Sequence, residues 1–215
     1  MIRLRWSCWK PPVICVALLF MMLGCASTPP ASFYVLNALP GLQQNGQVAP
    51  KAVGDLYVGV GPVKIPSYLD RVQIVTRSSE TTLQISEFHR WSEPVDKSLE
   101  RIIAENLTSL LASDNVFLYP WPGVRRVDYQ VMVEVKRFEG KPGEKVRLDA
   151  SWMLLSDGGK QVRLCRNSYI SEPVDGASYE DLVSSLSRAA AQLSREIGVA
   201  IAEEARSSHG VSPQG

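Results

Sequence analysis

Three stretches of alternating apolar and mostly polar residues, between residues 129 and 170, constrain the fold of this chain more than any other feature. In the first stretch Tyr129, Val131, Val133 and Val135 fall on one side. The second places five side chains on one face, Val146, Leu148, Ala150, Trp152 and Leu154. Glycine-containing turns at 140–143 and 157–160 separate the stretches, and residues 162–170 form the third. A period of two indicates strands that bury one face, so the pattern predicts an antiparallel three-strand meander.

Two segments with helical periodicity can pack against the apolar face of this sheet. Between residues 95 and 111 apolar residues recur every three or four positions, and Ser92 and Pro94 suit the N-cap and the first turn. Ser178 and Asp181 form a variant of the capping box before a second such segment, which ends near Ile201. Both segments therefore predict amphipathic helices.

Further β-rich stretches lie upstream of the meander, at 33–36, 56–63, 72–76, 82–86 and 116–119. The stretches at 72–76 and 82–86 have the pattern of a hairpin. The whole order predicts an α+β domain, in which two amphipathic helices pack on one face of a mostly antiparallel sheet. Trp152 shares the apolar face of its strand, which favours a core position.

The N-terminus combines three basic residues with an apolar run over 13–23 that ends in Leu23-Gly24-Cys25. This order is typical of an export signal, and the run is shorter than the roughly 20 residues that a spanning helix needs. The ending resembles a bacterial lipobox, which implies cleavage before Cys25 and attachment of lipid to its sulfur and its amine. The alternatives are an ordinary secretory signal with a chance cysteine, or an uncleaved anchor.

These features predict four parts of the chain. Residues 1–24 form a lipoprotein signal peptide, and 25–32 contain the lipidated cysteine and a tether. Residues 33–206 form a single α+β domain, and 207–215 form a disordered tail. About 190 residues remain after cleavage, which suffices for one sizeable core.

Charge and cysteine content exclude several classes of function. The leader contains three of the 23 Lys and Arg and none of the 22 Asp and Glu, so the mature chain has a net charge of −2. Nucleic-acid binders show a basic patch or stripe, and none is present here. Of the four cysteines only Cys165 remains in the domain without a lipid, so no internal disulfide is expected, and we expect this thiol to be a small buried hydrophobe.

Candidate catalytic and metal-ligating residues are few. The chain has two histidines, and one of them, His209, lies in the predicted tail. His89 therefore has neither the glycine-flanked serine of a hydrolase site nor the closely spaced Cys or His partners of a zinc site. We therefore predict no catalytic residue, no metal and no cofactor other than the covalent lipid. Trp121 stands between two prolines, outside any regular element. It is the aromatic residue most suited to face a partner, and the alternative is simple packing within its loop.

Several blocks in the mature chain carry a family resemblance. In order they are Tyr34-Val35-Leu36; Tyr68-Leu69-Asp70-Arg71-x-Gln73-Ile74-Val75-Thr76-Arg77; Arg90-Trp91-x-Glu93-Pro94 before a helix bearing Arg101 and Asn106-Leu107; Val133-x-Val135-x-x-Phe138-Glu139-Gly140; and Leu148-x-Ala150-x-Trp152. Together they resemble the PqiC/YmbA family of ABC-type transport auxiliary lipoproteins. His89 belongs to none of the blocks.

The resemblance implies a non-enzymatic partner of an inner-membrane ABC transporter and of an MCE-domain protein that bridges the periplasm. Such systems are linked to lipid trafficking and envelope integrity. The lipoprotein would lie on the periplasmic leaflet of the outer membrane, and Ala26 agrees, because an aspartate after the lipidated cysteine usually signals inner-membrane retention. A homo-oligomer remains open. The alternatives are a lipid-binding carrier and a structural outer-membrane lipoprotein.

The blocks that carry this resemblance also suggest a site. We expect one cluster to serve either as a docking surface or as a brace that holds a loop against the first helix, formed by Tyr68, Leu69, Asp70, Arg71, Arg90, Trp91 and Glu93.

Overall fold

The computed structural model describes residues 29–38, 56–121 and 126–209. The described residues from Ala31 onward form one compact unit. The predicted signal peptide at 1–24, the lipidation of Cys25 and the tail beyond His209 lie outside the described residues. No helix among the described residues is long and apolar enough to cross a membrane.

A five-stranded sheet forms the larger part of this unit, with the strand order β5-β2-β6-β7-β8. The predicted meander makes up three of its strands and is antiparallel throughout. The remaining two strands run parallel to their neighbours, since β2 pairs in parallel with both β5 and β6. The bounds are β2 Val58–Lys64, β5 Val116–Leu118, β6 Tyr129–Gly140, β7 Lys145–Ser156 and β8 Gln161–Pro173.

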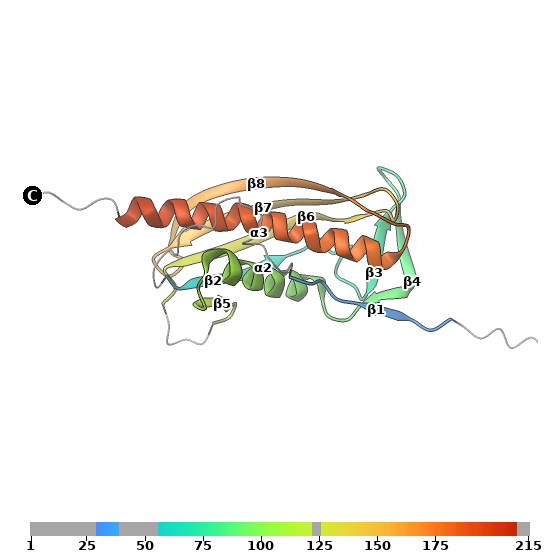
Figure 1. Ribbon diagram of the computed structural model, residues 1–215, viewed down its shortest axis with the longest axis horizontal. Coiled ribbons are helices and arrows are strands. Elements are labelled where there is room, and N and C mark those ends of the chain that lie inside the picture. Colours follow the sequence, from blue (N-terminus) through green and yellow to red (C-terminus); the bar gives the residue numbers. More distant parts are fainter. Residues whose placement is uncertain (1–28, 39–55, 122–125, 210–215) are drawn as a thin grey trace, which may run out of the picture. The chain divides into compact units, whose positions relative to one another are not determined.

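A second sheet of three strands has the order β1-β4-β3. Its strands are β1 (Ser32–Tyr34), β3 (Gln73–Arg77) and β4 (Leu83–Trp91). The hairpin of β3 and β4 is antiparallel, as the pattern predicts, and β1 adds to β4 in parallel. Figure 1 shows this small sheet near one end of the long strands, where β3 contacts β6.

Two helices, α2 (Val95–Leu111) and α3 (Tyr179–His209), pack side by side against the five-stranded sheet (Figure 1). Their apolar stripes meet the inner faces of β2, β6, β7 and β8, so the core lies between helices and sheet. Trp152 is 1% exposed and its Nε1 donates a 2.9 Å hydrogen bond to Ser168 Oγ, which confirms its predicted core position. Within the described ranges, the opposite face of the sheet carries no helix.

The α+β class is confirmed, but the strands divide differently from the single, mostly antiparallel sheet that the sequence predicts. The pattern of a strand reports which face is buried and says little about which neighbour it joins. Parallel pairing of β2 with β6 connects segments far apart in sequence, and no local turn signals it.

The helix termini show one wrong prediction and one confirmed prediction. The N-cap of α2 is Pro94, without a side-chain hydrogen bond, so Ser92 does not cap this helix. At α3, Asp181 N donates to Ser178 Oγ and Ser178 N donates to Asp181 Oδ2, both at 3.1 Å, as in a capping box. This helix continues to His209, through residues 207–209 that the sequence assigns to the tail.

Candidate functional site

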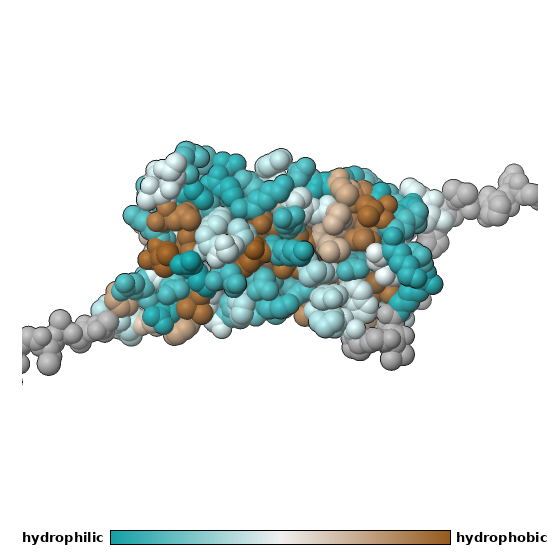
Figure 2. All heavy atoms as spheres, turned by 180° about the vertical axis from the view of Figure 1, so that it is seen from behind, coloured by the Kyte–Doolittle hydropathy of each residue, from teal (hydrophilic) through white to brown (hydrophobic). Residues whose placement is uncertain are grey.

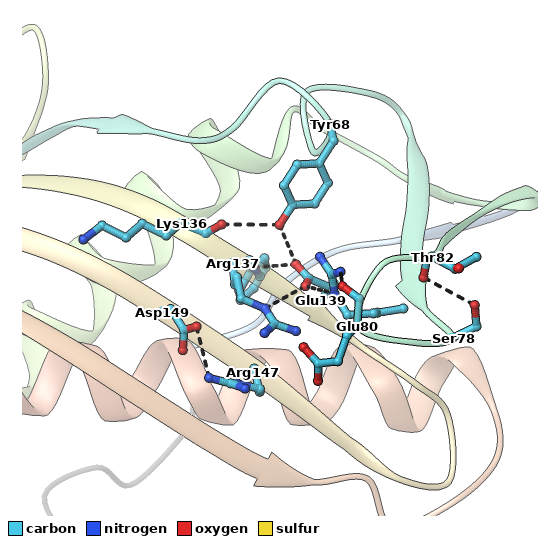
Figure 3. Close-up of polar contacts among 11 residues, drawn as sticks. Tyr68, Ser78, Glu80, Thr82, Lys136, Arg137, Glu139, Arg147 and Asp149 are labelled. Atoms are coloured by element: carbon cyan, nitrogen blue, oxygen red, sulfur yellow. Dashed lines mark hydrogen bonds and ion pairs between the residues drawn. The ribbon is translucent and has the colours of Figure 1, made fainter.

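A fully buried carboxylate, Glu139 at the end of β6, organises the junction of the two sheets (Figure 3). Tyr68 Oη donates a 2.7 Å hydrogen bond to its Oε2, and Arg77 Nε lies 2.7 Å from its Oε1. Arg137 Nε donates to Oε1 at 3.1 Å, and the backbone N–H of Phe138 donates to Oε2 at 3.1 Å. Both oxygens are therefore satisfied, as a buried charge requires.

The electrostatics of this hub favour an ionised Glu139. Burial alone would raise the pKa of its carboxyl, but hydrogen bonds from Tyr68 and Arg77, and the charge of Arg77, outweigh burial and hold the pKa below its ordinary value. Burial and the adjacent carboxylate raise the pKa of the Tyr68 hydroxyl. Tyr68 is thus a neutral donor to a charged acceptor, the arrangement that gives strong hydrogen bonds.

Tyr68 belongs to the tight turn that precedes β3. Leu69 N donates to Pro66 O at 2.9 Å and Asp70 N to Ser67 O at 3.3 Å, which closes the turn on itself. The side chain of Leu69 is buried in the core, whereas Asp70 and Arg71 are exposed. Two inward anchors, Tyr68 and Leu69, therefore hold an outward pair of opposite charges.

The second predicted block joins this turn through the backbone of β4. Trp91 N donates a 2.6 Å hydrogen bond to Val72 O, and the Trp91 ring is 7% exposed in the core. Arg90 faces its register partner Gln73, and its Nε donates to Glu87 O at 3.0 Å. These contacts give Trp91 and Arg90 roles within the fold.

Glu93 links the end of β4 to helix α2. Arg101 approaches its Oε1 with two nitrogens, at 2.6 and 3.2 Å, and also donates to Leu36 O at 3.1 Å. A further contact joins Arg101 to Glu105 at 3.1 Å. This guanidinium therefore braces the strand end and the chain after β1 against the helix.

Trp121 lies in a different part of the unit. Its ring covers Gly59 of β2, and it meets Tyr119 edge to face with ring centroids 5.6 Å apart. Gly59 lies in β2 and Tyr119 directly follows β5, so this packing is near the β5 edge of the five-stranded sheet. Trp121 is half-buried and does not join the residues around Tyr68.

Sequence reasoning missed the residues that hold the site together, Glu139, Arg77, Arg137 and Arg101. Three of them stand inside the family blocks, but no spacing rule connects them to Tyr68 or Glu93. Glu139 and Tyr68 are 71 positions apart, and only the meeting of the two sheets brings them into contact.

The remaining candidate side chains are those of His89 and Cys165. His89 Nδ1 lies 2.8 Å from Tyr34 Oη, and its ring stacks on Tyr179 at 3.8 Å between centroids, which joins β1, β4 and α3. Cys165 is exposed on β8, so the prediction of a buried thiol is wrong. Within the described ranges, no group of His, Cys, Asp and Glu side chains could hold a metal ion.

Comparison with known proteins gives a family match. A sequence model described as "ABC-type transport auxiliary lipoprotein component" matches residues 34–198, well over half of the chain. Intermembrane transport lipoprotein PqiC of Escherichia coli (strain K12) is 26% identical over 161 residues, which cover 72% of this chain and 81% of the relative. The protein of the same name from Shigella flexneri matches to the same extent.

Solved structures share the fold. A crystal structure of an uncharacterized protein superposes with a TM-score of 0.64 at 22% identity and covers 80% of this chain and 99% of its own. A protein from Xanthomonas campestris gives a TM-score of 0.63 at 17% identity, with coverage of 82% and 99%. At these identities the likeness establishes the fold alone.

Proposed function

Because this chain belongs to the family of ABC-type transport auxiliary lipoprotein components, the PqiC-type family, we propose that it docks a partner subunit of such a system from a lipid anchor. The partner is an MCE-domain protein that spans the periplasm and connects to an ABC transporter. The system moves lipid between membranes and supports the integrity of the envelope. The chain acts by binding and not by catalysis.

The anchor in this proposal is Cys25. Two lipid signals suffice for stable membrane attachment, and a triacylated cysteine exceeds that requirement. We place the domain on the periplasmic leaflet of the outer membrane, in keeping with Ala26 after the cysteine. A tethered domain meets its partner at a high effective concentration, so a modest surface can dock it.

The observation that carries the docking role is the exposed pair Asp70 and Arg71 on a turn that is fixed from below. Leu69 is 4% exposed in the core and Tyr68 is bonded to the buried Glu139, so the backbone that presents the pair has little freedom. A pre-organised surface loses less entropy on binding than a mobile one. Charged residues on such a surface favour specificity and the rate of association.

Crosslinking in intact cells, followed by purification of the lipidated protein and identification of its partners, tests this proposal. We expect an MCE-domain protein or an ABC subunit, and we expect its loss when Cys25→Ser releases the domain from the membrane. Recovery of outer-membrane proteins alone would contradict the docking role and favour a structural lipoprotein.

A further inference from the structure

The face of the five-stranded sheet that lies opposite the helices contains a groove of ≈ 260 Å³. Figure 2 shows this side of the molecule, where hydrophobic residues interrupt a hydrophilic surface. The groove lies over β6, β7 and β8, with Pro62 and Lys64 of β2 at one side. None of these lining residues belongs to the turn around Tyr68.

The side chains on this face form rows that follow the strand register. Met132 of β6 is opposite Met153 of β7, which is opposite Cys165 of β8. In the next row Gln130 is opposite Leu155, which is opposite Val162, and none of these three residues lines the groove. The row of Met132, Met153 and Cys165 alone therefore makes the apolar strip, and its two thioethers adapt to irregular ligands more readily than branched side chains do.

The row on the other side of Met132, Met153 and Cys165 is polar. Lys64, Glu134, Ser151 and Asn167 occupy it across four strands. Lys136 joins it, since its Nζ donates to Asn167 Oδ1 at 3.4 Å. Lys64 and Glu134 line the groove with one charge of each sign, and the ammonium of Lys136, outside the lining but bonded to Asn167, adds a second positive charge at this end.

The strands beneath the groove restrict what can bind. β6 and β7 are interior strands with partners on both sides, so their backbone N–H and C=O groups are already bonded. An extended peptide gains affinity chiefly by pairing with an open strand edge, which here is the outer edge of β8, in the plane of the sheet and not on the face that the groove covers. A hydrocarbon chain needs no hydrogen bond and gains by leaving water.

We propose that the groove binds a phospholipid, with an acyl chain along Met132, Met153 and Cys165 and an anionic headgroup against Lys64 and Lys136. The apolar strip and the second positive charge at its polar end match an anionic amphiphile in both parts. This inference goes beyond the docking role and stands on the groove alone. A negative result in the docking experiment therefore does not contradict lipid binding, and a negative result for lipid binding does not contradict docking.

Photo-crosslinking of the full chain tests the acyl-chain site. The protein is placed in vesicles of phosphatidylethanolamine and phosphatidylglycerol that contain a trace of phosphatidylglycerol with a diazirine in its acyl chain. We expect adducts on peptides that contain Met132 and Met153. Met153→Asp puts a charge in the apolar strip and should lower the adduct yield about tenfold or more.

Tyr169→Asp is the matched control, because Tyr169 is 71% exposed on β8 and does not line the groove. We expect its adduct yield to equal that of the wild type. If Met153→Asp fails to fold by circular dichroism, the double variant Met132→Ser, Met153→Ser replaces it. Adducts that persist undiminished in the folded groove variants, or that fall outside the groove, would overturn the proposal.

The headgroup is tested by Lys64→Glu. This change should lower adduct formation several-fold with the phosphatidylglycerol probe and leave a phosphatidylcholine probe of the same chain unchanged. An equal fall with both probes would overturn the headgroup assignment. Crosslinking of Cys165 to Cys165 between two copies, in place of lipid adducts, would assign the groove to a second copy and overturn the proposal as a whole.

Discussion

The hydroxyl of Tyr68 donates a 2.7 Å hydrogen bond to Oε2 of Glu139 and so joins two residues 71 positions apart. The bond ties the turn before β3 to the end of β6, which belongs to the other sheet. It connects an exposed, charged turn to a buried carboxylate that two guanidinium groups also hold. The stability of this hub and the behaviour of the turn above it can therefore be tested separately.

Tyr68→Phe removes this hydrogen bond and keeps the ring. We expect a loss of about 1.5–3 kcal/mol in the free energy of unfolding, because the bond joins a neutral donor to a buried charge. Urea denaturation measures it. Tyr169→Phe, at a site that is 71% exposed, is the control and should change stability by less than about 0.5 kcal/mol. Equal effects of the two changes would mean that the Tyr68 bond contributes nothing.

Glu139→Gln leaves Arg77 and Arg137 without their carboxylate. Removal of one partner from a buried ion pair costs about 3–5 kcal/mol, and we expect a loss of unfolding free energy in that range. Lys141→Gln breaks the exposed pair with Glu144 and should cost about 0–1 kcal/mol. A loss below 1 kcal/mol for Glu139→Gln would contradict the hub.

The depressed pKa of Glu139 also predicts a dependence of stability on pH. The folded state holds this carboxyl below its ordinary pKa of 4.5, so its contribution is complete above that pH and is lost as pH falls through the lower, folded pKa. The stability difference between wild type and Glu139→Gln should therefore shrink as the pH is lowered from neutral to about pH 3. Urea midpoints of both proteins across this range measure it, and a constant difference would show that folding does not lower the pKa of this carboxyl.

Gly59→Ala tests the packing of Trp121. An added Cβ would come within 2.5 Å of Cζ3 of the Trp121 ring, so the ring has to move. We expect a cost of about 1–3 kcal/mol in unfolding free energy. In a Trp121→Ala background the same change should cost little, and a double-mutant cycle measures the difference. An equal penalty in both backgrounds would mean that the Trp121 ring does not pack against Gly59.

The sequence was informative wherever one face of an element is buried and the pairing is local. The meander over 129–170, the β3–β4 hairpin and both amphipathic helices follow from periodicity and turns alone. The capping box at Ser178 and Asp181 is a contact three residues apart, so it was predictable as well. Helix α3 extends further than its apolar pattern indicates, because a helix once formed continues at little cost per residue.

Local sequence patterns do not predict which strands pair when long connections separate them. The division into two sheets depends on parallel contacts of β1 with β4 and of β2 with β5 and β6, which long connections separate. Cys165 is exposed because β8 is an edge strand and no helix of the described residues covers the outer face of its sheet. The motif Arg90-Trp91-x-Glu93 looks like a surface motif by its charges, yet Trp91 is in the core and Glu93 pairs with Arg101.

The most direct test of the docking account exchanges the two exposed charges, as the double variant Asp70→Arg, Arg71→Asp. Partner crosslinking in intact cells and the melting temperature of the purified protein are measured side by side with wild type. The account predicts loss of the crosslink to the MCE-domain or ABC partner at an unchanged melting temperature. Retention of the crosslink, or its loss together with a large fall in melting temperature, would contradict a docking surface at this turn.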